Sequence, residues 1–261
     1  MLNSGIQQYA QISFEQLAVA LVLIAVTVVL SRIEKLGLEK ELMIGTVRAF
    51  VQLMAVGYVL KAVFEARSPY WVFLALAAMT AVAGYTAAQR STDIPQAKWI
   101  AILSVGIGGL GTLAVLVGLG IISSAPRYVI PISGMLLGNS MNGAALAMNR
   151  VSSEIKLRRA QIEAALSLGA TSRQAADPAL KAAATAAMIP NINSMMTVGI
   201  VSLPGMMSGQ IIAGQSPTEA VRYQIVVLYM ITAAVTVASL AAALWSYRRF
   251  FTKDHQLKSE D

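Results

Sequence analysis

Amide side chains lie inside long apolar stretches of this sequence, where they are the groups best suited to contact a polar solute. Met135, Asn139, Asn142 and Asn149 are separated by four, three and seven residues, which places them on one face of a helix. Amides that face lipid are costly, so this face is expected to meet protein or a water-filled cavity.

A second polar group directly follows a proline. Asn193 and Thr197 are one helical turn apart, with Asn191 nearby, just after Pro190. Proline removes a backbone donor and so frees a carbonyl of the preceding turn. Thioethers that suit soft metals lie close by, at Met195, Met196, Met206 and Met207. Two interpretations stay open. These side chains either line a route for a solute, or they hydrogen-bond between helices and fill gaps.

One clear charge lies within an apolar stretch. Arg48 is about two turns from the basic end of its stretch, close enough to extend to the interface, and Gln52 shares its face one turn further in. The alternative is a role in the route or against a partner helix. The residues predicted to line a translocation pathway are Arg48, Gln52, Met135, Asn139, Asn142, Asn191, Asn193 and Thr197.

Several chemistries are excluded by composition. There is no cysteine, which excludes thiolate metal sites. The single histidine, His255, lies in a polar tail, which excludes a buried imidazole ligand. No metal ligands are therefore assigned. Acidic residues avoid the middle of the apolar stretches, which argues against a proton-coupled carrier. Gly106–Gly111 spells G-x-G-x-x-G within an apolar stretch, where packing of Ser104, Gly108 and Thr112 against another helix is the better account.

The chain also lacks the G-x-x-x-x-G-K-[ST] loop that cradles nucleotide phosphates. We therefore predict that it is not an enzyme and binds no cofactor, and that any driving energy comes from another protein docked on its cytoplasmic side. A sodium-coupled carrier that uses backbone carbonyls, and a passive channel, remain open.

The docking element is predicted at about 152–179, the longest basic connection. Glu163-Ala164-Ala165 continues a helix, Gly169 can end it, and Thr171 or Ser172 can cap the next one. A short helix, a tight turn and a second helix can transmit a rigid-body push.

The elements that position these residues are predicted to be membrane-spanning helices. The chain is 56% hydrophobic and only 13% charged, against about a quarter charged in soluble domains. Seven apolar stretches can each cross a bilayer of roughly 30 Å: 14–31, 42–64, 69–88, 99–122, 128–149, 180–204 and 219–247. The fold is predicted to be an all-α polytopic bundle, a single transmembrane domain over 1–250 with a polar cytoplasmic tail over 251–261.

The positions of charges and prolines refine this bundle. Basic residues follow the first, third, fifth and seventh stretches, which puts the N-terminus outside and the C-terminus in the cytoplasm. The same rule explains the net charge of +7 without a nucleic-acid partner. The sixth stretch is expected to kink or become irregular at Pro190 and at Pro204-Gly205. Met206–Pro217 is either a re-entrant piece or an ordinary external loop.

Two resemblances point to a family. Glu163-Ala164-Ala165 followed by Gly169 resembles the EAA loop of ABC permeases, the coupling helix that sits in a cleft of the ATPase. Longer stretches resemble the Fet-type ABC permease family over nearly the whole chain: Glu34–Leu36, Leu38–Lys40, Gly57–Lys61, Ile130–Met135, Gly138-Asn139, Ser167–Thr171, Met188–Pro190 and Thr197–Gly209. Bacterial members of this family are described as iron exporters and plant relatives as aluminium-tolerance proteins.

The resemblance implies a homodimer of this permease in the lipid membrane, joined to two copies of a separate ABC ATPase that carries ATP and Mg²⁺. Residues that it assigns to coupling are Glu163, Ala164, Ala165, Gly169, Ala170 and Thr171. The expected function is ATP-driven export of iron or a related metal across a bacterial inner membrane. Two alternatives stay open: a permease for an organic substrate such as a nucleotide sugar, and a non-transporting scaffold that regulates a partner ATPase.

Overall fold

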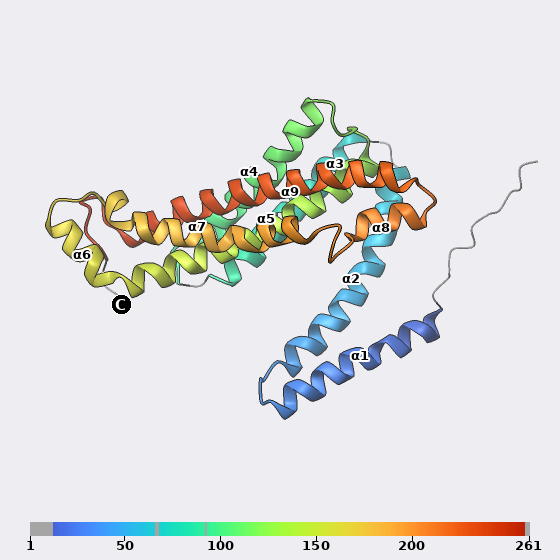
Figure 1. Ribbon diagram of the computed structural model, residues 1–261, viewed down its shortest axis with the longest axis horizontal. Helices are drawn as coiled ribbons and strands as arrows, with labels where there is room; N and C mark the ends of the chain where they lie inside the picture. Colours follow the sequence, from blue (N-terminus) through green and yellow to red (C-terminus); the bar gives the residue numbers. More distant parts are fainter. Residues whose placement is uncertain (1–12, 66–67, 92, 259–261) are drawn as a thin grey trace, which may run out of the picture. The chain divides into compact units, whose positions relative to one another are not determined.

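The computed structural model describes residues 13–65, 68–91 and 93–258, and within these ranges the secondary structure is helical apart from isolated β-bridges. Its elements are α1 (Phe14–Ile33), α2 (Glu39–Glu65), α3 (Pro69–Gln89), α4 (Ala97–Gly118), α5 (Pro126–Leu157), α6 (Arg159–Ser167), α7 (Ser172–Thr197), α8 (Gly205–Ile212), α9 (Pro217–Ser246) and the 3-10 helix η1 (Tyr247–Phe250). Figure 1 labels all of the α-helices.

The seven longest of these helices fall on the seven predicted stretches. In the described part of the chain, five are long and apolar enough to cross a membrane: α1, α2, α3, α4 and α9, which continues to Phe250. α5 and α7 are long enough but more polar, since they carry the amides noted above and extend into charged ends at Arg150–Leu157 and Ser172–Lys181. The prediction of an all-α polytopic membrane bundle is confirmed.

The chain divides into two compact units, 1–67 and 68–261. In the first unit, α1 and α2 form a helical hairpin. Ser13 and Gln16 form a capping box at the start of α1. The buried Ser31 closes the turn, because its hydroxyl donates to Glu39 (3.1 Å) and accepts from the Leu38 amide (3.2 Å). Most other residues of this hairpin are exposed, and many of them are large apolar side chains, as expected of helices that face lipid; charged side chains are also exposed, mainly near the turn and the end of α2.

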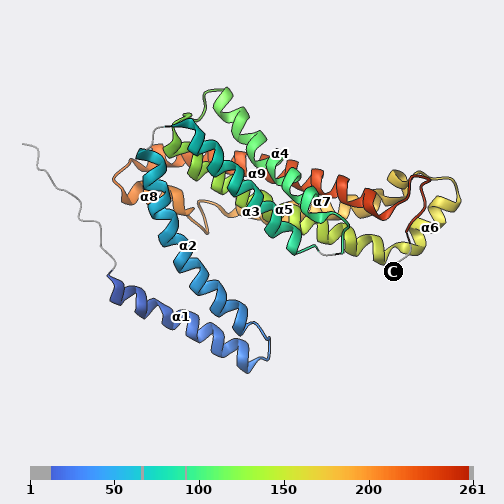
Figure 2. The same ribbon diagram turned by 180° about the vertical axis from the view of Figure 1, so that it is seen from behind.

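The second unit is built around α5 and α9, which pack against each other and against α4 and α7, while α3 packs against α4 and α5 (Figures 1 and 2). Small residues allow these helices to approach closely. A Cβ on Gly108 of α4 would lie 2.5 Å from the Ala234 carbonyl oxygen of α9. One on Gly143 of α5 would lie 2.7 Å from the Ser239 hydroxyl of α9. The predicted packing role of Gly108 is thus confirmed, and the glycine-rich run lies inside a continuous helix.

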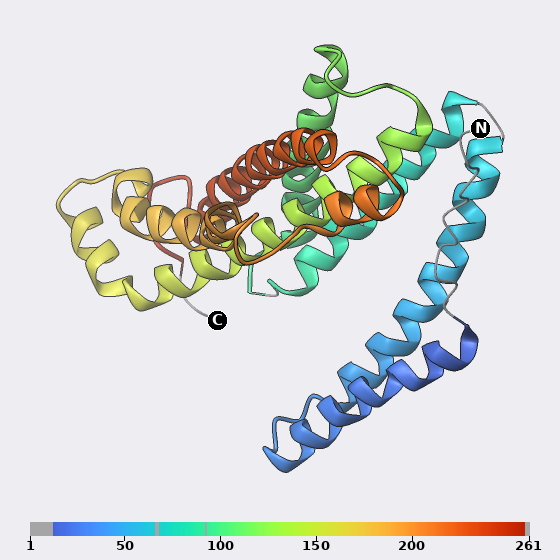
Figure 3. The same ribbon diagram turned by 45° about the vertical axis from the view of Figure 1, so that its right-hand side comes forward.

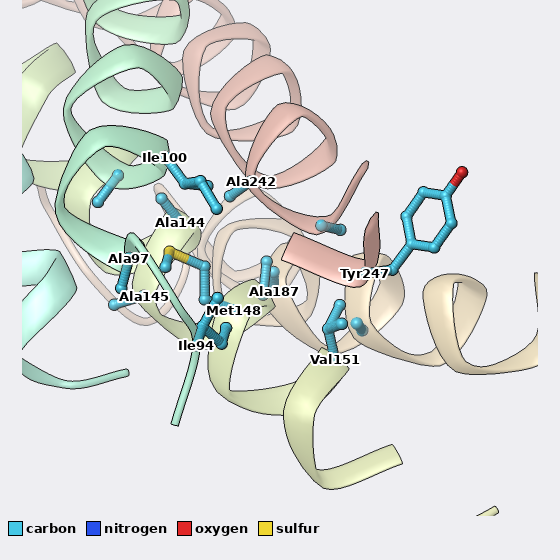
Figure 4. Packing of buried hydrophobic residues seen from close by; sticks show 14 of the residues in the cluster. Ile94, Ala97, Ile100, Ala144, Ala145, Met148, Val151, Ala187, Ala242 and Tyr247 are labelled. Carbon is cyan, nitrogen blue, oxygen red and sulfur yellow. The ribbon is translucent and has the colours of Figure 1, made fainter. Parts of the chain in front are cut away.

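The core of this unit is rich in alanine (Figure 4). Met148 and Val151 of α5 are fully buried among Ala144, Ala187 and other small side chains of neighbouring helices. In membrane proteins such close contacts replace the hydrophobic driving force that lipid cannot supply. The result is a framework that holds α5 and α7 at fixed spacing.

The sixth predicted stretch differs from the structure in two respects. A kink or irregular backbone was expected at Pro190; α7 continues as α-helix through Pro190, so the backbone there is not irregular, and the helix ends at Thr197. The predicted last seven residues, 198–204, form a turn in which Gly199 has a φ of +81°. After this turn comes α8, a short helix that packs on α9. The segment between the start of α7 and the end of α8 therefore consists of two helices joined by a turn (Figure 3).

Candidate functional site

The junction between α5 and α6 contains a buried carboxylate. Glu154 is only 2% exposed and accepts from Arg158 Nε (2.6 Å) and Arg150 Nη2 (2.7 Å). The hydrogen bond from Arg158 lowers the pKa of Glu154; burial opposes this, and the charges of Arg150 and Arg158 lower it further, so the net shift is downward. An ionised Glu154 thus ties the last turn of α5 to Arg158, the residue at which the chain leaves α5 and begins α6.

Helix α6 presents one anchored face and one exposed face. Ile162 is 2% exposed and belongs to the core, while Glu163 and Ala164 are exposed and Ala165 is half-buried against the core. Glu163 pairs with Arg159 at 3.0 Å. Leu168, directly after the helix, is 90% exposed, the highest value among the large apolar side chains that the structure describes.

The turn between α6 and α7 follows the predicted local rules. Gly169 has a φ of +89°, its amide donates to Leu166 O (2.9 Å), and the Ala170 amide donates to Ala165 O (3.0 Å). These two bonds are the Schellman motif. Thr171 caps α7 in a capping box with Gln174. Gly169 as the stop and Thr171 as the cap are therefore confirmed as structural assignments.

The C-terminal segment packs against this turn (Figure 3). Phe251 is buried and forms a β-bridge with Leu257, so the predicted tail folds back as far as it is described. His255 Nδ1 lies 2.7 Å from Ser172 Oγ and accepts from the Ser172 amide at 3.3 Å. A hollow of about 490 Å³ lies between the α6–α7 turn and the C-terminal segment. It is lined by Glu163, Leu166, Ser167, Gly169, Ala170, Asp254, His255 and Gln256. Nothing local in the sequence signals this contact, because its partners are more than 80 residues apart.

The amides of α5 lie on one face, as the spacing predicts. Met135, Asn139, Asn142 and Asn149 are exposed or half-buried, whereas the opposite side of α5 is buried. Asn139 Nδ2 donates to Met135 O in its own helix (2.8 Å). Asn142 and Asn149 accept instead from Arg90 Nη1 (3.4 Å) and Ser91 Oγ (3.0 Å), just after α3.

The polar groups of α7 lie beyond Pro190. Asn193 and Thr197 are exposed, and Thr197 donates to the Asn193 carbonyl (2.9 Å). Asn191 is half-buried, and its Nδ2 has no partner among the described residues. Across the described ranges, no hydrogen bond joins an α5 amide to an α7 amide. The structure places both groups on open faces of the second unit without joining them directly.

The segment after α7 keeps its backbone polar groups in local bonds. The Gly199 amide donates to Ser202 O (2.9 Å), and Pro204 and Gly205 begin α8. Ile200 and Val201 are strongly exposed. Met195 accepts at Sδ from Thr232 Oγ1 of α9 (3.1 Å), so this thioether serves a contact between helices.

Arg48 and Gln52 belong to the first unit, where both are exposed on α2. Among the residues that the structure describes, no group of three or more His, Cys, Asp or Glu side chains could hold a metal ion.

Comparisons with known proteins agree over nearly the full length. A family model described as "Uncharacterised protein family (UPF0014)" matches residues 14–251. "Protein ALUMINUM SENSITIVE 3" of Arabidopsis thaliana is 41% identical, covering 93% of this chain and 89% of the relative. The "UPF0014 membrane protein STAR2" of Oryza sativa subsp. japonica is 40% identical over 91% and 84%. The "Probable iron export permease protein FetB" of Escherichia coli (strain K12) is 39% identical over 94% and 95%. No solved structure matches this chain.

Proposed function

The chain belongs to the UPF0014 family of membrane proteins, and on that premise we propose that it is the membrane-spanning permease subunit of an ABC transporter. The observation that carries this proposal is the α5–α6–α7 end of the second unit (Figure 1). There a nine-residue helix is held between two fixed turns, with its core face anchored and its outer face open.

Three features suit this end to mechanical coupling. The Arg150–Glu154–Arg158 ion pairs fix the exit from α5. The Schellman motif at Gly169 and the cap at Thr171 fix the entry to α7. Glu163, Ala164 and Leu168 remain exposed between them for a partner. A force on α6 would then reach α5 and α7 without being absorbed by a flexible loop.

The partner is an ABC ATPase that carries ATP and Mg²⁺, with two copies serving a homodimer of this permease. A second copy would also cover the open half of α7, where Asn193 and Thr197 are exposed at a depth at which polar groups facing lipid are costly. Basic residues on the same side as α6 support a cytoplasmic location for that side, and we propose a bacterial inner membrane as the location, in line with the similarity to the Escherichia coli relative.

The proposed substrate is iron or a related metal ion, exported. The name of the Escherichia coli relative, a probable iron export permease, supports this choice. The available ligands are amides, hydroxyls and thioethers, which hold a hard metal weakly. Weak ligands suit a route that must release what it carries.

Reconstitution with an ABC ATPase tests the proposal. Liposomes containing both subunits are expected to move Fe(II) only with hydrolysable ATP, and Fe(II) on the side of ATP binding is expected to stimulate hydrolysis. Stimulation by a nucleotide sugar instead would favour an organic-substrate permease. Regulated hydrolysis with no solute movement would favour the scaffold.

A further inference from the structure

A second cavity lies away from the coupling turn and the amide faces, between the start of α4 and the end of α9. Its volume is about 330 Å³, at the lower end of the roughly 300–1,000 Å³ typical of ligand sites. Its lining is Trp99, Ile100, Leu103, Trp245, Arg248 and Arg249. Four apolar side chains and two guanidinium groups make it amphipathic.

The fold of η1 explains why the two arginines lie together. Tyr247 and Phe251 are both buried, and their rings pack edge to face with centroids 6.2 Å apart. The Arg173 guanidinium also lies over the Tyr247 ring, with its Cζ 5.8 Å from the ring centroid. These anchors hold the 3-10 turn, while Arg248 between them is exposed and Arg249 half-buried at the wall of the cavity.

The charges of Arg248 and Arg249 are not neutralised within the described ranges. Neither guanidinium has an ion pair or a hydrogen bond there. Asp254, five residues further along, lines the hollow at the α6–α7 turn and forms no ion pair with either arginine in the described structure. Two other acids at this end of the unit are paired with other basic residues. Asp93 pairs with Lys156 at 2.7 Å, and Glu154 pairs with Arg150 and Arg158. Two adjacent guanidinium groups without a carboxylate favour an anion, and Arg matches phosphate oxygens well.

The depth of the cavity favours a lipid over a soluble anion. α4 and α9 are both apolar enough to span a membrane, and the cavity lies where α4 begins and α9 ends. Tryptophan is enriched at the depth of the headgroups, and here Trp99 is exposed beside Ile100 and Leu103. Basic pockets between spanning helices are a known way to hold anionic headgroups.

We propose that this cavity binds a phospholipid with an anionic headgroup, with its phosphate on Arg248 and Arg249 and its acyl chain along Trp99 and Leu103. The proposal does not depend on the transported solute or on an ATPase. An acidic protein segment, or a second copy of this chain, would lack the acyl chain that the apolar wall accommodates.

The test is native mass spectrometry of the full chain after detergent exchange, with dioleoylphosphatidylglycerol or dioleoylphosphatidylcholine added back. Wild-type protein is expected to retain phosphatidylglycerol preferentially. Since a basic residue near the membrane surface contributes about 1 kcal/mol to binding an anionic lipid, Arg249→Gln should weaken retention roughly fivefold and the double Arg248→Gln/Arg249→Gln roughly 30-fold. The control is Arg222→Gln, an exposed arginine near the other end of α9, which should leave retention unchanged.

A second variant tests the cavity rather than the charge. Leu103→Trp adds bulk at a half-exposed wall position and keeps both arginines, so it should also reduce retention. Equal retention of the two lipids by wild type, or equal loss in Arg222→Gln, would overturn the proposal. Retention unchanged by Leu103→Trp would reduce the site to surface attraction and overturn the cavity assignment. If inorganic phosphate displaced the bound lipid and the protein retained both lipids equally, the arginines would instead bind a soluble anion, and the proposal would be overturned.

Discussion

Glu154 is a buried, ionised acid at the junction between α5 and α6, and the sequence alone does not single it out. In the sequence it is one acid in a basic run. Only the packing of α5 reveals that it is buried with two arginines on it. Ion pairs at four-residue spacing are common on helices and are usually exposed, so spacing could suggest the pairs but not their burial.

The ionised state of Glu154 predicts a pH dependence of stability. Its folded pKa is lowered from the ordinary value of 4.5 for a glutamate. It therefore stabilises the fold fully above that value and loses this contribution as pH falls through the folded pKa. Denaturation in mixed micelles should show Glu154→Gln less stable than wild type by about 2 kcal/mol at pH 7, the scale of a hydrogen bond to a charged group. The difference should shrink below about pH 4.5, and a difference independent of pH would contradict an ionised Glu154.

The amides at Asn139 and Asn193 predict a separation of stability from transport. Asn139 hydrogen-bonds only within α5 in the described structure, and Asn193 is exposed. Hydrogen bonds between membrane helices typically contribute about 0.6 kcal/mol. Asn139→Leu and Asn193→Leu should therefore each change the free energy of unfolding by less than this amount. If these amides line the route, metal efflux per folded complex should fall sharply. Unchanged efflux in both variants would remove this part of α5 and α7 from the pathway.

At the scale of elements, local signals in the sequence predict the turn between α6 and α7 well, because its hydrogen bonds are local. Gly169 and Thr171 act through bonds to residues three or four positions away. The end of α7 was predicted at 204 rather than at Thr197, because the apolar residues after Thr197 continue the hydrophobic stretch up to Pro204. Here the helix accommodates Pro190, and the positive φ at Gly199 accompanies the turn that follows α7.

Substitutions at Gly169 should uncouple the transporter without unfolding it. Gly169→Pro removes the amide that donates to Leu166 O and cannot adopt a φ of +89°. Gly169→Ala has open space around its Cβ, so only the left-handed backbone is penalised, by roughly 1–2 kcal/mol. We expect substrate-stimulated hydrolysis to be abolished in Gly169→Pro and reduced in Gly169→Ala, at normal protein levels. Normal stimulation in Gly169→Pro would place the docking site elsewhere.

Two glycines of α4 form a matched pair for testing helix packing. A Cβ at Gly108 would lie 2.5 Å from the Ala234 carbonyl oxygen, whereas one at Gly111 would meet nothing within 4 Å. Gly108→Ala should lower the free energy of unfolding by about 1–3 kcal/mol, as overpacking does. Gly111→Ala should be neutral or stabilising by up to about 1 kcal/mol, from helix propensity. Thermal unfolding in detergent measures both, and equal effects would mean that α4 and α9 do not pack at Gly108.

At the scale of the whole molecule, the sequence predicts the helical membrane bundle. In lipid, the backbone N–H and C=O groups of each apolar stretch must hydrogen-bond within that stretch, and a helix achieves this. Contacts between distant segments could not be predicted in this way. Arg90 with Asn142 is one example, and His255 with Ser172 is another. In each pair the partners are more than 50 residues apart, and neither residue carries a local motif that names the other.

We expect α6 and the turn after it to contact an ABC ATPase, and cysteine cross-linking can detect this contact. The chain contains no cysteine, so Leu168→Cys, at a 90% exposed position, gives a single reactive thiol at the turn. Ile212→Cys, exposed at the end of α8, is the control. In membranes containing the candidate ABC ATPase, Leu168→Cys is predicted to cross-link to the ATPase in a manner that changes with ATP, and Ile212→Cys is predicted not to. Absence of any cross-link from Leu168→Cys, while both thiols react with a small maleimide, would contradict the account.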